Sequence, residues 1–361
     1  MIATFFDCFL RSFIMMYSRA RHVWRTTSIC LRFVFFAVLG LSASMAYAEP
    51  PKQLKIAAVF GSGPDDPWNA TLLAAWADIK AKKPHGLEIN DPVYTENVWG
   101  DAAEAALRLY ARKGYDIVWA AAGYADQVRR IRAQYPNTLF VLTGAPNEPM
   151  GGNVYVVYNR IFEPAYLAGM VAGQLTKTGV LGAVAGYPTE DTNDAINAFF
   201  AGAKSVRPNI KQKVSFIASW WDPPMAVEAM KAQVSAGADQ ELMLSSSFEA
   251  CKQQKITCYG GYRDWNPVAP QYIATSALGS WHPAFQWIID QWYEARTSDK
   301  PFNGNMDKRY FGMAQGGADL APYHDFPIPA DVAAKVSAVK VKIESRQFAV
   351  PLDVAKPVSS N

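Results

Sequence analysis

The stretch DAAEAALRLYARKGYDIVWAAAG, residues 101–123, decides the fold of this chain. Its first part, 101–113, carries apolar residues at i, i+3 and i+4 spacing and predicts an amphipathic helix. Gly114 stands where a helix end favours a positive φ, and the apolar run from Ile117 predicts a buried strand. A further helix is expected from Asp126. This order of helix, Gly-x-Asp turn, strand and helix is typical of an α/β protein.

The same order occurs a second time. A helix over 225–236 is followed by Gly237-Ala238-Asp239, the apolar run QELMLSSS and a helix near Phe248. Another pair, LKIAAVFGSGPDD from Leu54 and VLGAVAGYPTED from Val180, keeps nearly the same separation along the chain. The repetition predicts two similar α/β lobes that face each other across a cleft, and clefts between domains are favoured ligand sites.

Several strand candidates are continuous apolar runs, as expected for parallel strands covered by helices on both faces. A helix over 283–294 and a strand over 308–313 indicate that the chain crosses between the lobes more than once, and the tail from Pro322 is expected to pack on the second lobe. We therefore predict two doubly wound parallel sheets. The strand candidates are KIAAVF from Lys55, DIVWAAA from Asp116, TLFVLTG from Thr138, VYVVY from Val154 and VLGAVAG from Val180.

The first 48 residues have the pattern of a secretory signal. Arginines precede the apolar run FVFFAVLGL from Phe33, and Ala46-Tyr47-Ala48 has the small-x-small form of a cleavage site. We expect cleavage near Ala48 and a periplasmic protein; translation starting at Met15 or Met16 is an alternative to the long leader. An uncleaved membrane anchor is the other interpretation, but the apolar run is well short of the ~20 residues that a spanning helix needs.

Removal of this leader changes the charge and the cysteine content. Five of the 35 Lys and Arg and one of the 32 Asp and Glu lie in it, so the mature chain is nearly neutral, which argues against nucleic acid as a partner. Cys8 and Cys30 are removed too, and neither directly follows the apolar run as a lipid-modified cysteine would, so we expect a soluble protein. Cys251 and Cys258 remain, either as a disulfide or as two buried thiols.

Signals of catalysis and of cofactors are poor. After maturation the chain has no H-x-x-x-H motif, no zinc-like spacing, no G-x-x-x-x-G-K-[ST] loop and no G-x-S-x-G elbow. Gly61-Ser62-Gly63 lacks the third glycine of a dinucleotide loop. We therefore predict no catalytic residues, no metal and no cofactor.

Aromatic residues in loops are more informative. Trp68, Tyr124, Tyr187, Trp220 and Trp265 each follow a predicted strand and stand near an aspartate. Loops at the carboxyl ends of parallel strands line the ligand crevice of open α/β sheets. Rings beside carboxylates suit a planar, hydrogen-bonding ligand, although each ring alone is more often a packing residue and Asp65 or Asp66 alone is an ordinary helix cap.

Taken in order, these loops resemble the basic membrane protein (BMP) family of periplasmic substrate-binding proteins of ABC importers, which includes purine nucleoside receptors. The resemblance covers roughly residues 52–350, and its most specific segment is FEPAYLAGMVAGQLTKTGVLGAVAGYP, 162–188. It implies a type I periplasmic binding protein: two lobes joined by a three-segment hinge. The implied lobes are 52–160 plus 280–312 and 161–279 plus 313–361, after a signal peptide over 1–48.

The resemblance also implies a binding site. The family's Asp-x-x-aromatic after the first strand falls on Asp65 and Trp68, with Asn69 beside them. Its second stacking ring falls on Trp220, its Gly-Tyr-x-Asp loop places Tyr124, and its ribose-binding acid falls on Asp264.

Two segments depart from the nucleoside-receptor pattern. Thr275-Ser276-Ala277 has no lysine where many members have one, and Ser245–Phe248 lacks the usual acidic or glycine-rich character. A free nucleobase is therefore at least as well supported as a nucleoside.

The sequence thus predicts a monomeric, non-enzymatic binding protein that holds a purine base or nucleoside and delivers it to an ABC permease. A sugar or signalling molecule on the same fold, a sensor that docks on a membrane receptor, and a hydrolase using Asp65 and Asp264 as acid and base remain the alternatives.

Overall fold

The computed structural model describes residues 49–245, 248–298 and 300–360. The predicted signal peptide, its cleavage site and the serines at 246 and 247 lie outside these residues. Residues 50–361 form one compact unit. Across the described ranges, none of the helices is both long and apolar enough to cross a membrane.

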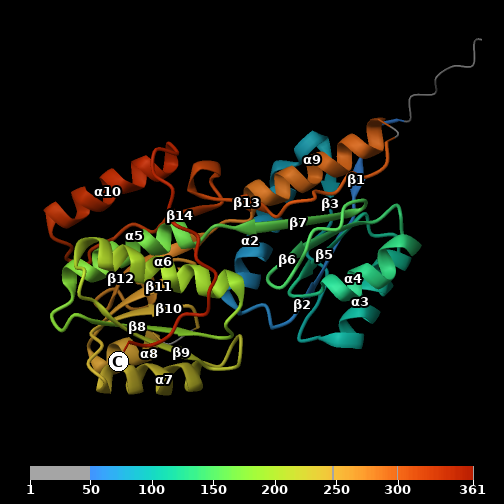
Figure 1. Ribbon diagram of the computed structural model, residues 1–361. Coiled ribbons are helices and arrows are strands. Elements are labelled where there is room, and N and C mark those ends of the chain that lie inside the picture. Colours follow the sequence, from blue (N-terminus) through green and yellow to red (C-terminus); the bar gives the residue numbers. More distant parts are fainter. Residues whose placement is uncertain (1–48, 246–247, 299, 361) are drawn as a thin grey trace, which may run out of the picture. The chain divides into compact units, whose positions relative to one another are not determined.

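Two six-stranded sheets organise the described residues (Figure 1). The first has the order β13-β7-β6-β5-β2-β4 and is parallel throughout. Its strands are β2 (Ile56–Phe60), β4 (Tyr94–Thr95), β5 (Ile117–Ala121), β6 (Leu139–Thr143), β7 (Val154–Asn159) and β13 (Arg309–Phe311). A small ladder pairs β1 (Gln53–Leu54) with β3 (Glu88–Ile89).

The second sheet has the order β14-β12-β11-β10-β8-β9. It is parallel except for β14, which runs antiparallel to β12. Its strands are β8 (Val180–Ala185), β9 (Lys211–Phe216), β10 (Gln240–Met243), β11 (Thr257–Tyr262), β12 (Ile273–Gly279) and β14 (Ala318–Leu320).

Helices cover both faces of each sheet, which explains why the strands are apolar throughout. On the first sheet, α2 (Pro67–Lys82) and α9 (His282–Ser298) share a core with one face, while α3 (Gly100–Arg112) and α4 (Ala125–Ile131) cover the other (Figure 1). On the second sheet, α5 (Phe162–Leu175), α6 (Glu190–Val206) and α10 (Ala330–Glu344) cover one face, and α7 (Pro223–Ser235) and α8 (Phe248–Gln254) the other. We call each sheet with its helices a lobe.

The chain passes from one sheet to the other between β7 and α5, between β12 and α9, and between β13 and β14. The described residues therefore show two doubly wound parallel-sheet lobes with three connecting segments. This confirms the fold class expected from the repeated helix, turn and strand pattern.

The glycines of the segment 162–188 have a role in helix packing. Helices α5 and α6 approach so closely that a Cβ on Gly169 would lie 1.9 Å from the Phe199 carbonyl oxygen. A Cβ on Gly202 would likewise lie 1.9 Å from the Tyr166 carbonyl oxygen. Only glycine fits at such a backbone contact, so this pair fixes how α5 lies across α6.

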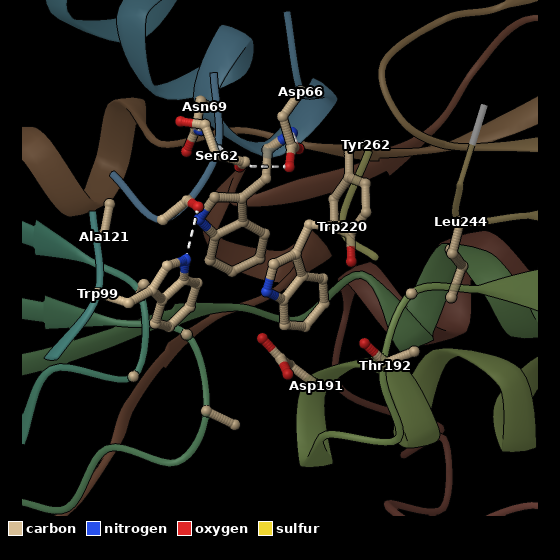
Figure 2. Close-up of a pocket in the computed structure, with 17 residues that line it drawn as sticks. Ser62, Asp66, Asn69, Trp99, Ala121, Asp191, Thr192, Trp220, Leu244 and Tyr262 are labelled. Atoms are coloured by element: carbon tan, nitrogen blue, oxygen red, sulfur yellow. Dashed lines mark hydrogen bonds between the residues drawn. The ribbon is translucent and has the colours of Figure 1, made fainter. Parts of the chain in front are cut away.

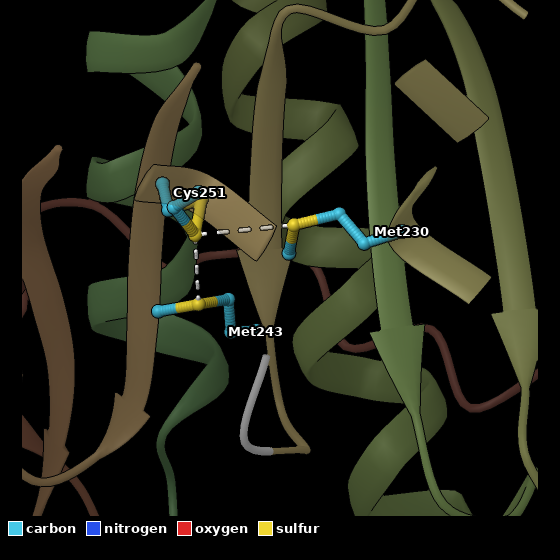
Figure 3. The surroundings of a disulfide bond; sticks show 4 residues. Met230, Met243 and Cys251 are labelled. Carbon is cyan, nitrogen blue, oxygen red and sulfur yellow. Dashed lines mark hydrogen bonds between the residues drawn. A yellow bond between two sulfur atoms is a disulfide. The ribbon is translucent and has the colours of Figure 1, made fainter. Parts of the chain in front are cut away.

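The structure settles the question of the two remaining cysteines. Cys251 on α8 and Cys258 on β11 form a disulfide. Sulfur atoms of Met243 and Met230 lie 3.3 and 3.9 Å from Cys251 Sγ (Figure 3). A disulfide sulfur carries no proton, so these are packing contacts in the core between α7, α8 and the sheet.

Candidate functional site

A pocket lies between the two lobes at the carboxyl ends of their strands (Figure 2). The cavity volume is ≈ 70 Å³, counted as the space open to the centre of a water molecule. The lining residues are Gly61, Ser62, Asp66, Trp68, Asn69, Trp99, Ala121, Ala122, Gly123, Gly144, Ala145, Gly186, Asp191, Thr192, Trp220, Leu244 and Tyr262.

The loop between β2 and α2 forms one polar wall. Asp66 caps α2: its Oδ1 accepts a hydrogen bond from the Trp68 amide at 2.9 Å. Its Oδ2 accepts from the Ser62 hydroxyl at 2.7 Å. Asn69 Nδ2 donates to Ser62 Oγ at 3.0 Å and to the Gly63 carbonyl at 2.9 Å. These bonds hold the loop rigidly against the first turn of the helix.

Three indoles surround the cavity, each held by a different contact. Trp68 packs edge-to-face on Tyr262 and Trp281, with ring centroids 5.6 and 4.9 Å away. Trp99 Nε1 donates to the Gly61 carbonyl at 2.8 Å, and its ring covers that glycine so closely that a Cβ there would lie 2.2 Å from it.

Trp220 is held from the second lobe. The Tyr187 ring lies 4.9 Å from it, and the Tyr187 hydroxyl donates to the Ala218 carbonyl in the same loop. Gly186 packs beneath, where a Cβ would lie 3.0 Å from the indole. These contacts fix the position of the Trp220 ring.

Two carboxyl groups line the pocket. Burial raises the pKa of Asp66, and the hydrogen bonds from Ser62 and Trp68 offset only part of the rise. Burial also raises the pKa of Asp191, with a further contribution from Glu190, against hydrogen bonds from Thr189 and from backbone N–H groups. Lysine, arginine and histidine are missing from the lining residues that the structure describes. Such a wall suits a ligand that donates hydrogen bonds and disfavours an anion.

The structure brings together three of the six residues predicted from sequence. Trp68, Asn69 and Trp220 line one pocket, from both lobes. The other three lie outside its lining, and their contact with a ligand stays a prediction. Asp65 is exposed, one residue before the cap of α2. Tyr124 is fully buried and its hydroxyl donates to the Val98 carbonyl at 2.6 Å.

Asp264, the third, lines a different hollow beside the connecting segments. Its Oδ2 lies 2.6 Å from His324 Nε2, and its Oδ1 accepts from the Asn266 amide. Neither Asp65 nor Asp264 lines the pocket, so the acid–base pair that the hydrolase alternative requires is not brought together there. In the described part of the chain, we find no group of His, Cys, Asp and Glu that could hold a metal ion.

Sequence reasoning missed Trp99, Asp191 and Tyr262. Trp99 precedes α3 in a loop that follows β4, a strand of only two residues. Asp191 lies in the first turn of α6 and Tyr262 ends β11. All three obey the rule that identified Trp68 and Trp220, namely that loops at carboxyl strand ends converge on the crevice.

Comparisons with known proteins identify the family. The family of PnrA-like ABC transporter substrate-binding proteins (Bmp) matches residues 54–314. A purine-binding protein of Brucella abortus is 24% identical over 261 residues, 70% of this chain and 71% of that protein. A putative ABC transporter glucose-binding protein of Haloferax volcanii is 29% identical over 241 residues, 64% of this chain and 61% of that protein.

A solved structure shares the fold. An ABC transporter solute-binding protein of Aeropyrum pernix superposes with a TM-score of 0.67 at 19% identity, over 83% of this chain and 94% of that chain. This likeness shows the fold alone, with parallel-sheet lobes of the periplasmic binding protein type. The family match extends from before β2 to after β13 and includes every loop around the pocket. The chain therefore belongs to the Bmp family of PnrA-like ABC transporter substrate-binding proteins.

Proposed function

We propose that this protein captures a free purine base, or a flat heterocycle of the same size, and delivers it unchanged to an ABC permease. The observation that carries the proposal is the meeting of Trp68 and Trp220, from opposite lobes, in one small cavity with buried carboxyl groups. One base–aromatic stack contributes about 1–3 kcal/mol. The purine-binding relative in Brucella abortus agrees with this ligand class.

A free base is favoured over a nucleoside for two reasons. Asp264, the expected ribose partner, is held by His324 outside the cavity. Ala277 stands where a lysine is common in nucleoside receptors. A ribose thus lacks its expected partners.

Binding and release are proposed to follow from lobe closure. The bodies that move are 52–160 plus 280–312 and 161–279 plus 313–361, about the three connecting segments. A ligand that contacts both lobes only in the closed form shifts the population toward that form. The permease then recognises the closed protein. We further propose that the protein acts as a monomer in the periplasm, after cleavage of residues 1–48.

A sugar is the second candidate ligand, because one relative is a putative glucose-binding protein. Indole rings also stack on sugars, so the aromatic wall alone does not separate the two classes. The lining is rich in glycine and alanine, however, and offers few side-chain partners for a ring of hydroxyl groups. This composition favours a heterocycle.

The test is calorimetry on protein beginning at residue 49, freed of endogenous ligand by unfolding and refolding, with adenine, guanine, hypoxanthine, adenosine and glucose. We expect a base to bind more tightly than adenosine and glucose. Ligand at ~100 times Kd should also add about 2.7 kcal/mol to the free energy of unfolding.

Trp220→Ala should weaken binding of the base by about 1–3 kcal/mol. Trp221→Ala is the matched control, because the neighbouring indole packs in the core of its own lobe and does not line the pocket. Equal affinities of wild type and Trp220→Ala, or tighter binding of glucose than of every base, would contradict the proposal. A bound base that mass spectrometry recovers chemically changed would contradict the non-enzymatic role.

A further inference from the structure

One oxygen in the pocket wall has no partner. Asp191 lies in the first turn of α6, and Figure 2 shows its carboxyl group turned into the pocket on the side of Trp220. Its Oδ1 atom is buried and makes no hydrogen bond. Among the lining residues that the structure describes, Asp191 supplies the one buried side-chain oxygen without a hydrogen bond.

Three neighbouring polar side chains of the wall, those of Asp66, Asn69 and Thr192, already have partners within the protein. Asp66 accepts from Ser62 and from the Trp68 amide, and Asn69 Nδ2 donates to that same loop. Thr192 Oγ1 lies 3.0 Å from Thr189 Oγ1. These pairs build the wall, so they are not available to a ligand without rearrangement. The Asp191 carboxyl group receives hydrogen bonds from Thr189 and from backbone N–H groups, but its Oδ1 atom is available to a ligand.

An unpaired buried oxygen is unfavourable in the empty protein. Burial raises the pKa of Asp191, which shows how poorly its surroundings solvate the charged form. The same carboxyl group affects Tyr262 across the pocket. Burial is the main cause that raises the pKa of the Tyr262 hydroxyl, and the charge of Asp191 raises it further. A ligand N–H placed against Oδ1 would supply the missing partner.

We propose that Asp191 is the specificity-determining residue of the pocket and selects heterocycles that carry an amino N–H over isosteres that lack one. The inference rests on the proposed function, because it takes a stacked heterocycle in the pocket as given. The indoles recognise only the flat faces of the ligand, whereas Asp191 recognises its edge. A ligand with no donor at that edge leaves Oδ1 unpaired in a closed pocket, and polar sites discriminate strongly in that way.

Matched ligands separate the two contributions. Adenine and 2-aminopurine each add one amino group to unsubstituted purine, at different ring positions. 6-Dimethylaminopurine keeps the bulk of a substituent and the ring N–H but has no amino N–H. Wild-type protein should bind at least one aminopurine 10-fold or more tightly than purine and than the dimethyl compound. Asp191→Ala should abolish that preference and leave purine within about twofold of wild type. Asp191→Asn, which keeps an acceptor oxygen of the same shape, should retain part of the preference.

Glu190→Gln is the control, since Glu190 lies one residue earlier and does not line the pocket. Any change that it causes should apply to all ligands by the same factor. Thermal unfolding of each variant shows whether it folds, and the asparagine variant keeps the test valid if the alanine variant does not.

The outcomes distinguish this inference from the proposed function. If Trp220→Ala weakens every purine alike and Asp191→Ala leaves the amino preference intact, the stacking site stands and the role of Asp191 is overturned. An equal loss for all ligands in Asp191→Ala overturns it as well. If wild-type protein binds no purine at all, the proposed function falls, and this inference falls with it.

Discussion

Lys308 and Glu190 form an ion pair between the lobes, with 2.8 Å from Nζ to Oε2. Lys308 directly precedes β13 of the first sheet, and Glu190 begins α6 on the second. Glu148 of the first lobe lies 3.1 Å from the same ammonium group, which is only 15% exposed. Burial lowers the pKa of Lys308, but Glu190 and Glu148 raise it by more, so the ammonium group stays charged at neutral pH.

This pair should favour lobe closure. We expect Lys308→Met to weaken every ligand by the same factor, about fivefold, because about 1 kcal/mol of closed-state stabilisation is lost while the pocket is untouched. Calorimetry with two ligands of different structure measures the factor. Lys335→Met, which removes an exposed pair within α10, should leave affinity unchanged. Unchanged affinity in Lys308→Met would mean that the pair does not contribute to closure.

The contact between α5 and α6 should be intolerant of a single methyl group. Gly169→Ala places a Cβ 1.9 Å from the Phe199 carbonyl oxygen, so the two helices must move apart. We expect a loss of about 1–3 kcal/mol in the free energy of unfolding, measured by urea titration. Gly63→Ala is the control, since nothing lies within 4 Å of its added Cβ. Equal stability of the two variants would show that the helices are not packed as described.

The disulfide should stabilise the second lobe. Cys251 and Cys258 are seven residues apart and join α8 to β11. Loop closure of this length contributes about 2–3 kcal/mol, so the double variant Cys251→Ala/Cys258→Ala should unfold at lower temperature than wild type. Reductant should lower the wild-type midpoint to a similar extent and leave the variant unaffected. A wild-type midpoint that does not respond, although thiol titration shows the bond broken, would refute this role.

Much of the fold was predictable because its signals are local. The run from Ile117 to Ala121 is apolar at every position, and the helix before it carries a clear stripe, so both elements follow from periodicity. Strand β9, in contrast, reads KQKVSF and lies at the edge of its sheet. In a solvated edge strand, apolar and polar residues alternate only weakly. Such a pattern does not distinguish the strand from a loop. Helix α10, in the tail, was likewise not predicted.

The candidate site was predictable only in part, for a geometric reason. The convergence of strand ends places Trp68 and Trp220 near the crevice. It does not tell which of two adjacent acids faces the ligand: Asp191 turns into the pocket, while Glu190 turns to Lys308. Which of the two acids faces the pocket depends on how α6 is rotated about its own axis relative to both sheets. The Asp264 carboxyl group instead contacts His324, which lies 60 residues away in the sequence, so no local pattern predicts this contact.

The stability of the second lobe should decrease as pH rises, because of one buried acid. Glu241 on β10 lies opposite Gly182 on β8, and its carboxyl oxygens are buried without a partner. Gln233 Oε1 is also unpaired, and it and both Glu241 oxygens lie within 2.2 Å of the point that a Cβ on Gly182 would occupy. A protonated Glu241 can donate to Gln233 and satisfy both groups. Burial accordingly raises the pKa of Glu241 well above the ordinary 4.5.

The sign follows from proton binding. In the folded protein Glu241 keeps its proton above pH 4.5, whereas in the unfolded chain it ionises there. Stability is therefore complete below pH 4.5 and falls by up to about 1.4 kcal/mol per pH unit until the folded pKa is reached. Glu241→Gln cannot ionise, so its unfolding free energy should exceed that of wild type by a margin that grows from pH 4.5 up to the raised pKa of Glu241 in the folded protein. Glu249→Gln, at an exposed position, should track wild type. If the curve for Glu241→Gln runs parallel to that of wild type across this range, Glu241 does not stay protonated in the fold.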